Sequence, residues 1–340
     1  MPTEEQIRDS LNEVIIPGVM RSPVRLNLVR EVTVLDDNVN VVLASAALSS
    51  DAQNWLKDKV SDIVKKLPGV NEVAVDFIEA KPGELNDISY VIAVMSGKGG
   101  VGKSLVTSLL GVALARQGKE VGILDADITG PSIPRMFGIS QSRPTGSDSG
   151  MMPVLSKMGI GIMSINLVLE NEDDAVIWRG PLIGKAIQQF WGDVLWGKLD
   201  YLIVDLPPGT ADAPLTVMQS LPVSGVVIVF SPQELAAMVV RKAMKMVQQM
   251  DIPILGMVEN MSYFVLPDSG KKLKIFGESR GEEMTKLSGT SLLAQIPIDP
   301  ELARLCDEGA IERYDLKVFK DFAQDFAQIL PLKAKQNSIT

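Results

Sequence analysis

The chain has 340 residues, of which 46% are hydrophobic and 22% are charged, and its formal net charge is -9. This length suits about two domains with a sizeable core, while the acidic charge and the lack of any apolar run near ~18 residues argue against nucleic acids or membranes as partners. A single cysteine, Cys306, and the absence of histidine exclude an intrachain disulfide and a histidine or multi-cysteine metal site within one chain, and they favour a cytoplasmic location.

The first 80 residues predict a small α/β domain. Alternating apolar residues indicate strands, and Pro68-Gly69 is a strong helix stop. The expected elements, in chain order, are a helix over 4–14, strands over 28–35 and 39–46, a helix over 50–67 and a strand over 70–78. Residues 81–88 have the composition of a linker.

From residue 88 onward, short apolar runs alternate with helical stretches. Continuous apolar runs are typical of a parallel sheet that is covered on both faces. Strands are expected over 90–95, 120–124, 160–165, 201–204, 225–230 and 254–260, and helices over 105–117, 181–196 and 234–249. The polar segment 141–153 is expected to be a loop. The predicted fold is therefore α/β: a doubly wound, mostly parallel sheet of a P-loop NTPase domain over 89–333, preceded by the small domain over 1–80 and followed by a flexible tail over 334–340.

One segment matches the phosphate-binding pattern G-x-x-x-x-G-K-S: Gly97-Lys98-Gly99-Gly100-Val101-Gly102-Lys103-Ser104. It lies between a predicted strand and a predicted helix, which is the context that the motif requires. The glycines allow backbone N–H groups to converge on phosphate oxygens, and the helix N-terminus adds partial positive charge. We expect Lys103 to contact the β- and γ-phosphates of ATP and Ser104 to hold Mg²⁺ through its hydroxyl.

Acidic residues follow two further predicted strands, at the sheet edge where doubly wound folds bind ligands. Asp205 is placed to hold Mg²⁺ through water, and Asp127 is placed to orient the attacking water. Gly209, in the loop after Asp205, can offer a backbone N–H to the γ-phosphate, so that this loop senses hydrolysis. A strand-end aspartate on its own would more simply be a helix cap.

Lys98 is a second lysine at the start of the phosphate loop. Lys103 already serves the phosphates, and Lys98 cannot easily reach the same phosphates from its own chain. It could instead cross a dimer interface to the partner's nucleotide, as an arginine finger does in trans. The alternative is a solvated surface lysine. Lys98, Lys103 and Asp127 form the predicted catalytic set.

The loop over residues 97–104 resembles the deviant Walker A loop of the ATPases that include the nitrogenase iron protein, the arsenite-pump ATPase and the cell-division regulator MinD. Within that class, further segments resemble the Mrp/ApbC subfamily, and they lie at 125–132, 178–181, 205–212 and 258–264. Residues 1–80 resemble the small metal–sulfur cluster biosynthesis domain that often precedes it.

The resemblance implies an ATP-binding, ATP-hydrolysing homodimer that carries iron–sulfur clusters to apoproteins. It also implies that Asn260 hydrogen-bonds the adenine and that Pro297 and Asp299 line the base pocket. Lys98 matches the family's signature lysine, which agrees with a role in trans.

The chain departs from the family pattern after residue 264. Members usually carry a Cys-x-x-Cys pair there that binds a cluster across the dimer, whereas this chain has Leu266 and Ser269. Cluster iron requires thiolate ligands, and the helical pattern around Cys306 favours packing over ligation. An iron–sulfur cofactor is thus implied by the family but not by these residues.

Three functions remain open. The first is an ATPase of the iron–sulfur carrier family that acts on apoprotein clients. The second is a nucleotide-switched scaffold or regulator that binds no cluster and works with a cysteine-bearing partner. The third is a positioning or partition ATPase, which would need a basic DNA-binding face or a basic amphipathic membrane helix, and neither is evident.

Overall fold

The computed structural model describes residues 1–128, 130–169, 180–315, 326 and 329. The tail expected over 334–340 and the motif residues Trp178 and Arg179 lie outside these described residues. The chain forms two compact units: the first comprises residues 1–88, 143–154 and 189–199, and the second comprises 89–142, 155–188 and the residues from 200 onward.

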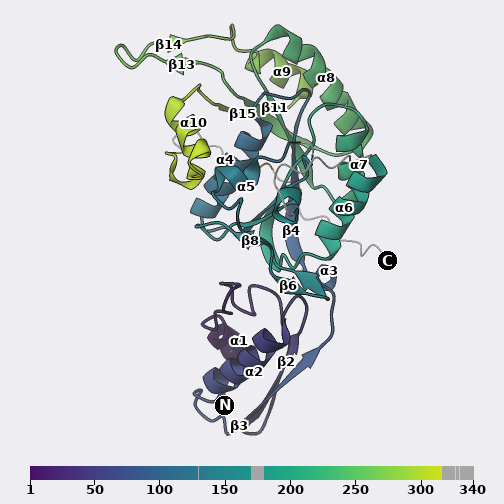
Figure 1. The fold of residues 1–340 in the computed structure, drawn as a ribbon, viewed down its shortest axis with the longest axis vertical. Helices are drawn as coiled ribbons and strands as arrows, with labels where there is room; N and C mark the ends of the chain where they lie inside the picture. Colours follow the sequence, from purple (N-terminus) through teal and green to yellow (C-terminus); the bar gives the residue numbers. More distant parts are fainter. Residues whose placement is uncertain (129, 170–179, 316–325, 327–328, 330–340) are drawn as a thin grey trace. The chain divides into compact units, whose positions relative to one another are not determined.

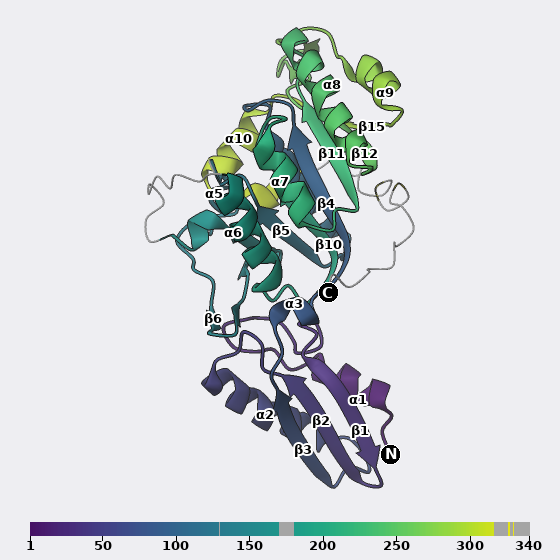
Figure 2. The same cartoon turned by 90° about the vertical axis from the view of Figure 1, so that its right-hand side faces the viewer.

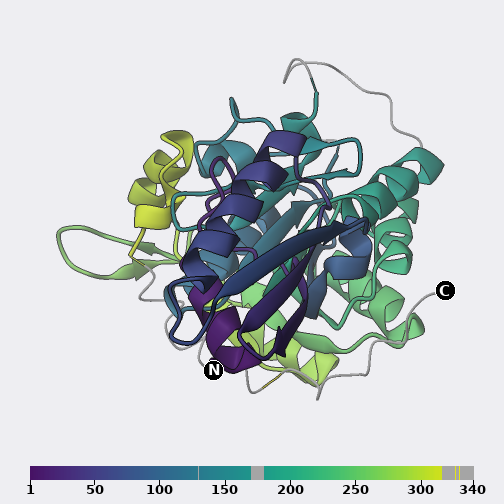
Figure 3. The ribbon, with the colours of Figure 1, turned by 90° about the horizontal axis from the view of Figure 1, so that it is seen from below.

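In the first unit, a helix packs on a three-stranded sheet of order β1-β2-β3. β1 and β2 are antiparallel and joined by a tight turn in which Asp36 has a φ of 52°, while β3 runs parallel to β2 after the crossover helix α2. Figure 3 shows α2 lying along this sheet. The bounds are α1 Glu4–Leu11, β1 Val29–Leu35, β2 Asn38–Ala44, α2 Ser50–Val64 and β3 Glu72–Ile78. All five elements expected from the sequence are confirmed, with bounds that differ by up to three residues; β2 begins one residue earlier than expected, at Asn38.

Two segments assigned by sequence to the ATPase domain, 143–154 and 189–199, group with the first unit. Long-range hydrogen bonds explain this grouping. The Ala47 N–H donates to Ser149 Oγ at 3.1 Å, and Asn86 Nδ2 donates to the Val194 carbonyl at 2.9 Å. The polar segment 141–153 also contains a small hairpin of β6 (Gly146–Ser147) and β7 (Gly150–Met151) rather than loop alone.

The segment expected as a linker, residues 81–88, contains structure. Pro82 begins the short helix α3 (Pro82–Leu85), since its fixed φ suits the first turn. The Asp87 N–H then donates to the Gly197 carbonyl at 2.9 Å, and Asp87 begins strand β4. The segment whose composition indicated a linker therefore forms a short helix and the start of a strand.

The second unit is built on an eight-stranded sheet of order β15-β12-β11-β4-β10-β5-β9-β8. The pairs β11–β4, β11–β12, β12–β15, β10–β5 and β5–β9 are parallel. The strands are β4 Asp87–Ser96, β5 Val121–Asp125, β8 Val154–Leu155, β9 Gly161–Ser164, β10 Lys198–Asp205, β11 Gly225–Phe230, β12 Ile254–Glu259 and β15 Leu292–Gln295. β5 and β11 are buried along their whole length. The predicted doubly wound, mostly parallel sheet is confirmed.

Helices cover both faces of this sheet, as Figures 1 and 2 show. On one face lie α4 Lys103–Arg116, α5 Ile133–Met136 and α10 Pro300–Asp307. On the other face lie α6 Gly180–Gly192, α7 Asp212–Ser220 and α8 Glu234–Gln249. The strand order reverses beside β4. After β4 the chain first builds strands on the side of β10 and β5, and it then crosses to build β11 and β12 on the other side. Ligands bind such a sheet at the reversal, beyond the carboxyl ends of the strands.

Within residues 1–128, 130–169 and 180–315, every helix is too short or too polar to span a bilayer.

Two glycines at helix ends have the same left-handed backbone conformation but different surroundings. Gly289 follows α9 (Gly281–Ser288) and Gly309 follows α10, with φ values of 68° and 66°. A Cβ on Gly289 would meet open space, whereas one on Gly309 would collide with Gly138 Cα and lie 2.8 Å from Gly138 N.

We expect Gly289→Ala to lower the free energy of unfolding by about 1 kcal/mol, which is the left-handed backbone cost alone. Gly309→Ala should lower it by about 3 kcal/mol, because α10 must also separate from Gly138. Urea titration of both variants measures the difference. Equal losses would contradict the close approach of α10 and the segment after α5.

Candidate nucleotide site

The phosphate loop joins the carboxyl end of β4 to the N-terminus of α4. Gly100 and Gly102 have φ values of 80° and 82°, a left-handed conformation that side chains rarely adopt. A Cβ on Gly97 would lie 2.7 Å from the backbone of Val239 on α8. Glycine is therefore required at the start of the loop by close packing and at its end by backbone conformation.

Lys103 is the buried cation of the site. Its side chain is 5% exposed, and Nζ lies 2.8 Å from Asp205 Oδ2 and 3.4 Å from Asp127 Oδ2. Asp205 is fully buried at the end of β10. Lys103, Asp205 and Asp127, which the sequence predicted to contact phosphate, magnesium and the attacking water, therefore lie together at one edge of the sheet.

The carboxylate of Asp205 has separate partners on its two oxygens. Ser104 Oγ donates to Oδ2 at 2.5 Å, and Thr107 Oγ1 donates to Oδ1 at 2.7 Å. Ser104 and Asp205 supply hydroxyl and carboxylate oxygens, which are the ligands that Mg²⁺ prefers. Among the described residues no three His, Cys, Asp or Glu side chains form a metal-binding group, so magnesium here would also need phosphate oxygens and water.

Asp125 is a buried carboxyl at the strand end before Asp127, to which the sequence analysis assigned no role of its own. Burial, and then the neighbouring charge of Asp205, raise the pKa of Asp125 to about 8. Ser164 Oγ donates to Asp125 Oδ2 at 3.3 Å, and the Asp127 N–H contacts Oδ1 at the same distance. A protonated Asp125 at neutral pH removes one negative charge from a crowded cluster and supports the backbone of Asp127. Its position two residues before Asp127, at a strand end, was the signal in the sequence.

The loop after β10 is tied to the phosphate loop. The Gly209 N–H donates to the Ser96 carbonyl at 3.0 Å, and Gly209 has a φ of 97°. The N–H expected to meet the γ-phosphate is therefore occupied by the last residue of β4. Sensing of a phosphate by Gly209 requires this bond to open.

Lys98 is half-buried, and its ammonium group makes a contact outside the Lys103 cluster. Its Nζ donates to Gln233 Oε1 at 2.7 Å, at the start of α8. Within one chain, the contact described for its ammonium group is thus with a neutral amide and not with the carboxylates of the site.

The three residues expected around adenine lie on two neighbouring loops beyond β12 and β15. Asn260 is buried, and its Nδ2 donates to the Val101 carbonyl of the phosphate loop at 2.9 Å. Pro297 lies next to the loop that contains Asn260, since the Ser262 N–H donates to the Ile296 carbonyl. Asp299 caps α10 by accepting the Glu301 N–H at 2.9 Å. Asn260 therefore contacts the site directly, whereas the Asp299 carboxylate has a structural role in this structure.

Glu259 anchors the segment that follows Asn260. It is fully buried and accepts hydrogen bonds from Ser262 Oγ at 2.5 Å, from the Arg280 N–H at 2.7 Å and from Gln295 Nε2 at 2.8 Å. Ser262 and Arg280 stand at the two ends of an extended segment, so one carboxylate holds both ends together. The sequence analysis missed this residue.

Between those ends the chain forms a hairpin of β13 (Phe264–Val265) and β14 (Lys272–Leu273), which extends from the ribbon in Figure 1. Leu266 and Ser269, the positions at which the sequence resemblance led us to expect cysteines, lie in its turn. The Leu266 N–H donates to the Lys271 carbonyl at 2.9 Å. Cys306 lies on α10, and burial with the nearby Asp307 charge raises the pKa of its thiol to about 11. A thiol of this kind is a poor thiolate ligand.

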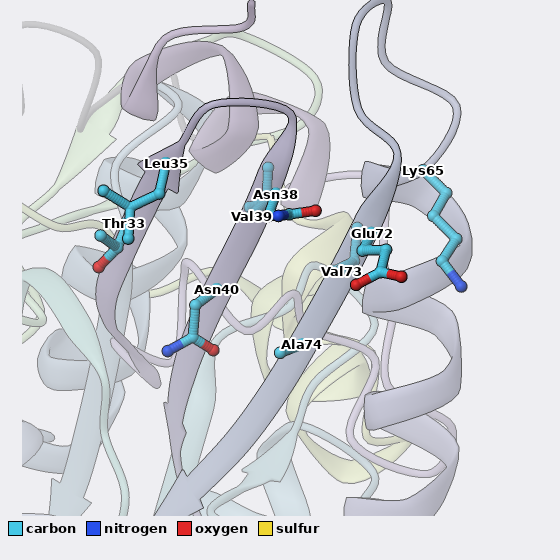
Figure 4. Close-up of a pocket in the computed structure, with 9 residues that line it drawn as sticks. All are labelled: Thr33, Leu35, Asn38, Val39, Asn40, Lys65, Glu72, Val73 and Ala74. Atoms are coloured by element: carbon cyan, nitrogen blue, oxygen red, sulfur yellow. The ribbon is translucent and has the colours of Figure 1, made fainter.

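A separate hollow of about 440 Å³ lies on the sheet of the first unit, and Figure 4 shows it between strands β1, β2 and β3. Thr33, Asn40 and Ala74 line its floor, and the Oδ1 atom of Asn40 is buried without a hydrogen-bond partner. The hollow contains no cluster of catalytic side chains, so we assign no chemistry to it.

Comparison with known proteins agrees with this geometry. Residues 87–330 match a family described as the NUBPL iron-transfer P-loop NTPase, and residues 4–77 match one described as an iron–sulfur cluster assembly protein. An iron–sulfur cluster carrier protein of Synechocystis is 38% identical over 321 residues, which cover 91% of each chain. The carrier protein of Escherichia coli is 37% identical and covers 86% of this chain and 81% of its own length.

Solved structures show the same fold. A nucleotide-binding protein from Archaeoglobus fulgidus, in complex with ADP, is 47% identical, with a TM-score of 0.62 over 72% of this chain and 94% of its own. MinD in the MinC:MinD complex of Aquifex aeolicus is 22% identical with a TM-score of 0.52, over 72% of this chain and 98% of that chain, and is similar in fold. The resemblance drawn from the sequence motifs is confirmed: the chain belongs to the NUBPL iron-transfer P-loop NTPase family, whose curated relatives are named iron–sulfur cluster carrier proteins.

Proposed function

We propose that this chain binds and hydrolyses ATP as a homodimer and acts in the assembly or transfer of iron–sulfur clusters to apoproteins. The observation that carries the proposal is the buried Lys103 ammonium group, which faces Asp205 and Asp127 at the end of a glycine loop. The ADP complex of the related Archaeoglobus protein and the names of the curated relatives support it.

In this proposal each residue of the site has a role. Residues 97–104 bind the phosphates, with Lys103 on the β- and γ-phosphates, and Ser104 and Asp205 hold Mg²⁺. Magnesium would supply neutralisation of phosphate charge. Asp127 orients the attacking water, and Gly209 responds to the γ-phosphate. On the adenine side we propose Asn260, Pro297 and Asp299, which requires Asn260 to exchange its bond to Val101 for one to the base.

Lys98 is proposed to act in trans. Its contact with Gln233 is exposed, and an exposed hydrogen bond of this kind is worth little, so it is readily exchanged. In a dimer, Lys98 would leave Gln233 and stabilise charge on the partner's nucleotide. This makes hydrolysis depend on assembly.

A second candidate function is a nucleotide-switched scaffold that binds no cluster itself. The observation that favours it is the turn of the β13–β14 hairpin, where Leu266 and Ser269 supply no thiolate. With the Cys306 thiol half-buried on α10, cluster thiolates would come from a cysteine-bearing partner. For both candidate functions we propose a cytoplasmic location, with neither nucleic acid nor membrane as a partner.

In the Lys103 cluster, ATP binding and turnover can be measured separately. Lys103→Ala should weaken ATP binding about a hundredfold, because it removes a charge-assisted contact worth ~3 kcal/mol. Asp127→Asn should slow turnover about a hundredfold while ATP affinity changes by less than about threefold. Calorimetry and phosphate release measure both quantities. Wild-type turnover in Asp127→Asn would remove Asp127 from the mechanism.

A role of Lys98 in trans can be measured through the dependence of turnover on protein concentration. Lys98→Ala should bind ATP as the wild type does and lose the rise in specific turnover with protein concentration, a loss of about a hundredfold or more. Gln233→Ala is the matched control, since it removes the contact within one chain and leaves the lysine. Hydrolysis by Lys98→Ala at the wild-type rate would show that the lysine has no role in trans.

Cluster binding by the purified chain separates the two candidate functions. After anaerobic incubation with iron and sulfide, the wild type should show no cluster chromophore, and the double variant Leu266→Cys/Ser269→Cys should gain one, since a dimer then offers four thiolates. ATP binding is the control for folding in each case. A wild-type chromophore that disappears in Cys306→Ser would rule out the cluster-free scaffold, because Cys306 is the one cysteine of the chain.

A further inference from the structure

Thr107 is a buried hydroxyl residue of α4 that lies outside the phosphate-binding pattern. It follows Ser104 by three residues and Lys103 by four, so the three side chains lie on one face of the helix. Its exposed fraction is 0%. A hydroxyl in such a place is expected to have a definite partner.

The Thr107 hydroxyl has one proton and two acceptors within reach. Oγ1 lies 2.7 Å from Asp205 Oδ1 and 3.1 Å from the Lys103 carbonyl. The carbonyl already has a helical partner in the backbone N–H four residues on. The shorter contact is to a carboxylate, and hydrogen bonds to ionised acceptors are the stronger ones. The proton therefore belongs to the bond with Asp205.

This bond gives the two oxygens of Asp205 different surroundings. Oδ1 is directed to Thr107, while Oδ2 is directed to Ser104 Oγ at 2.5 Å and to Lys103 Nζ at 2.8 Å. Rotation of the carboxylate would break the Thr107 bond and leave a buried oxygen without a donor, which costs about 1–3 kcal/mol. Thr107 thus keeps Oδ2 on the side of the proposed magnesium ligand Ser104.

We propose that Thr107 is a positioning residue for magnesium: by fixing the Asp205 carboxylate it sets how strongly Mg²⁺ tightens nucleotide binding. The proposal rests on the nucleotide function proposed above. Residues that orient metal ligands typically change metal affinity by about 10–100-fold when they are replaced.

The test measures ADP affinity by calorimetry on the full chain, once with excess Mg²⁺ and once with EDTA. The ratio of the two affinities reports magnesium coupling without any need for turnover. In Thr107→Val, which replaces the hydroxyl by a methyl group of similar size, the ratio should fall about tenfold. The affinity in EDTA should stay within about twofold of the wild type, since the phosphate loop is unchanged.

Two controls separate positioning from folding. Ser108→Ala removes a buried hydroxyl of the same helix that donates to the Ser104 carbonyl at 2.8 Å, and it should keep the wild-type ratio. If Thr107→Val does not fold, Thr107→Ser and Thr107→Ala form a second pair, both without the methyl group, of which only the serine variant should keep the ratio.

An unchanged ratio in the variants without the hydroxyl would overturn the proposal, as would an equal loss of affinity with Mg²⁺ and with EDTA, which indicates a merely structural role. A wild-type affinity for ADP that is indifferent to Mg²⁺ would also overturn it. If the wild type binds no ADP in either condition, the nucleotide function itself is wrong, and that result is distinguishable from the others.

Discussion

The ion pair between Lys103 and Asp205 is the interaction on which the rest of the site depends. Both groups are buried at the end of the sheet, and a buried charge without its partner is strongly destabilising. The parallel sheet places Asp205 beside β4, and the phosphate loop returns Lys103 to the same edge. The pair holds the Lys103 cation at this edge in the absence of phosphate. Burial, and then the charge of Asp205, raise the pKa of the neighbouring Asp125.

The adjacent residues Glu259 and Asn260 link this edge to the hairpin. The Asn260 side chain bonds the phosphate loop, while the Glu259 carboxylate holds both ends of the segment that carries β13 and β14. A change in the contacts of Asn260 on nucleotide binding would therefore act at the base of the hairpin. The turn of this hairpin contains Leu266 and Ser269, which offer no thiolate.

Sequence reasoning succeeded where local pattern determines structure. The glycine loop between a strand and a helix predicted Lys103 and Ser104, and strand-end position predicted that Asp205 and Asp127 would join them. Contacts between distant segments were not predictable in this way. The donors of Glu259 come from three separate segments, and residues 143–154 and 189–199 group with the N-terminal unit through individual hydrogen bonds that no local pattern encodes. The two-residue strands β13 and β14 are too short to give a periodic signal.

We infer that carboxylates hold the buried ammonium group of Lys103 until phosphates replace them. A crystal structure with a non-hydrolysable ATP analogue and Mg²⁺ tests this most directly. We expect Lys103 Nζ to leave Asp205 Oδ2 and to contact the β- and γ-phosphates, with Ser104 on the metal. An analogue bound elsewhere, with the Lys103–Asp205 pair still at 2.8 Å, would contradict the account.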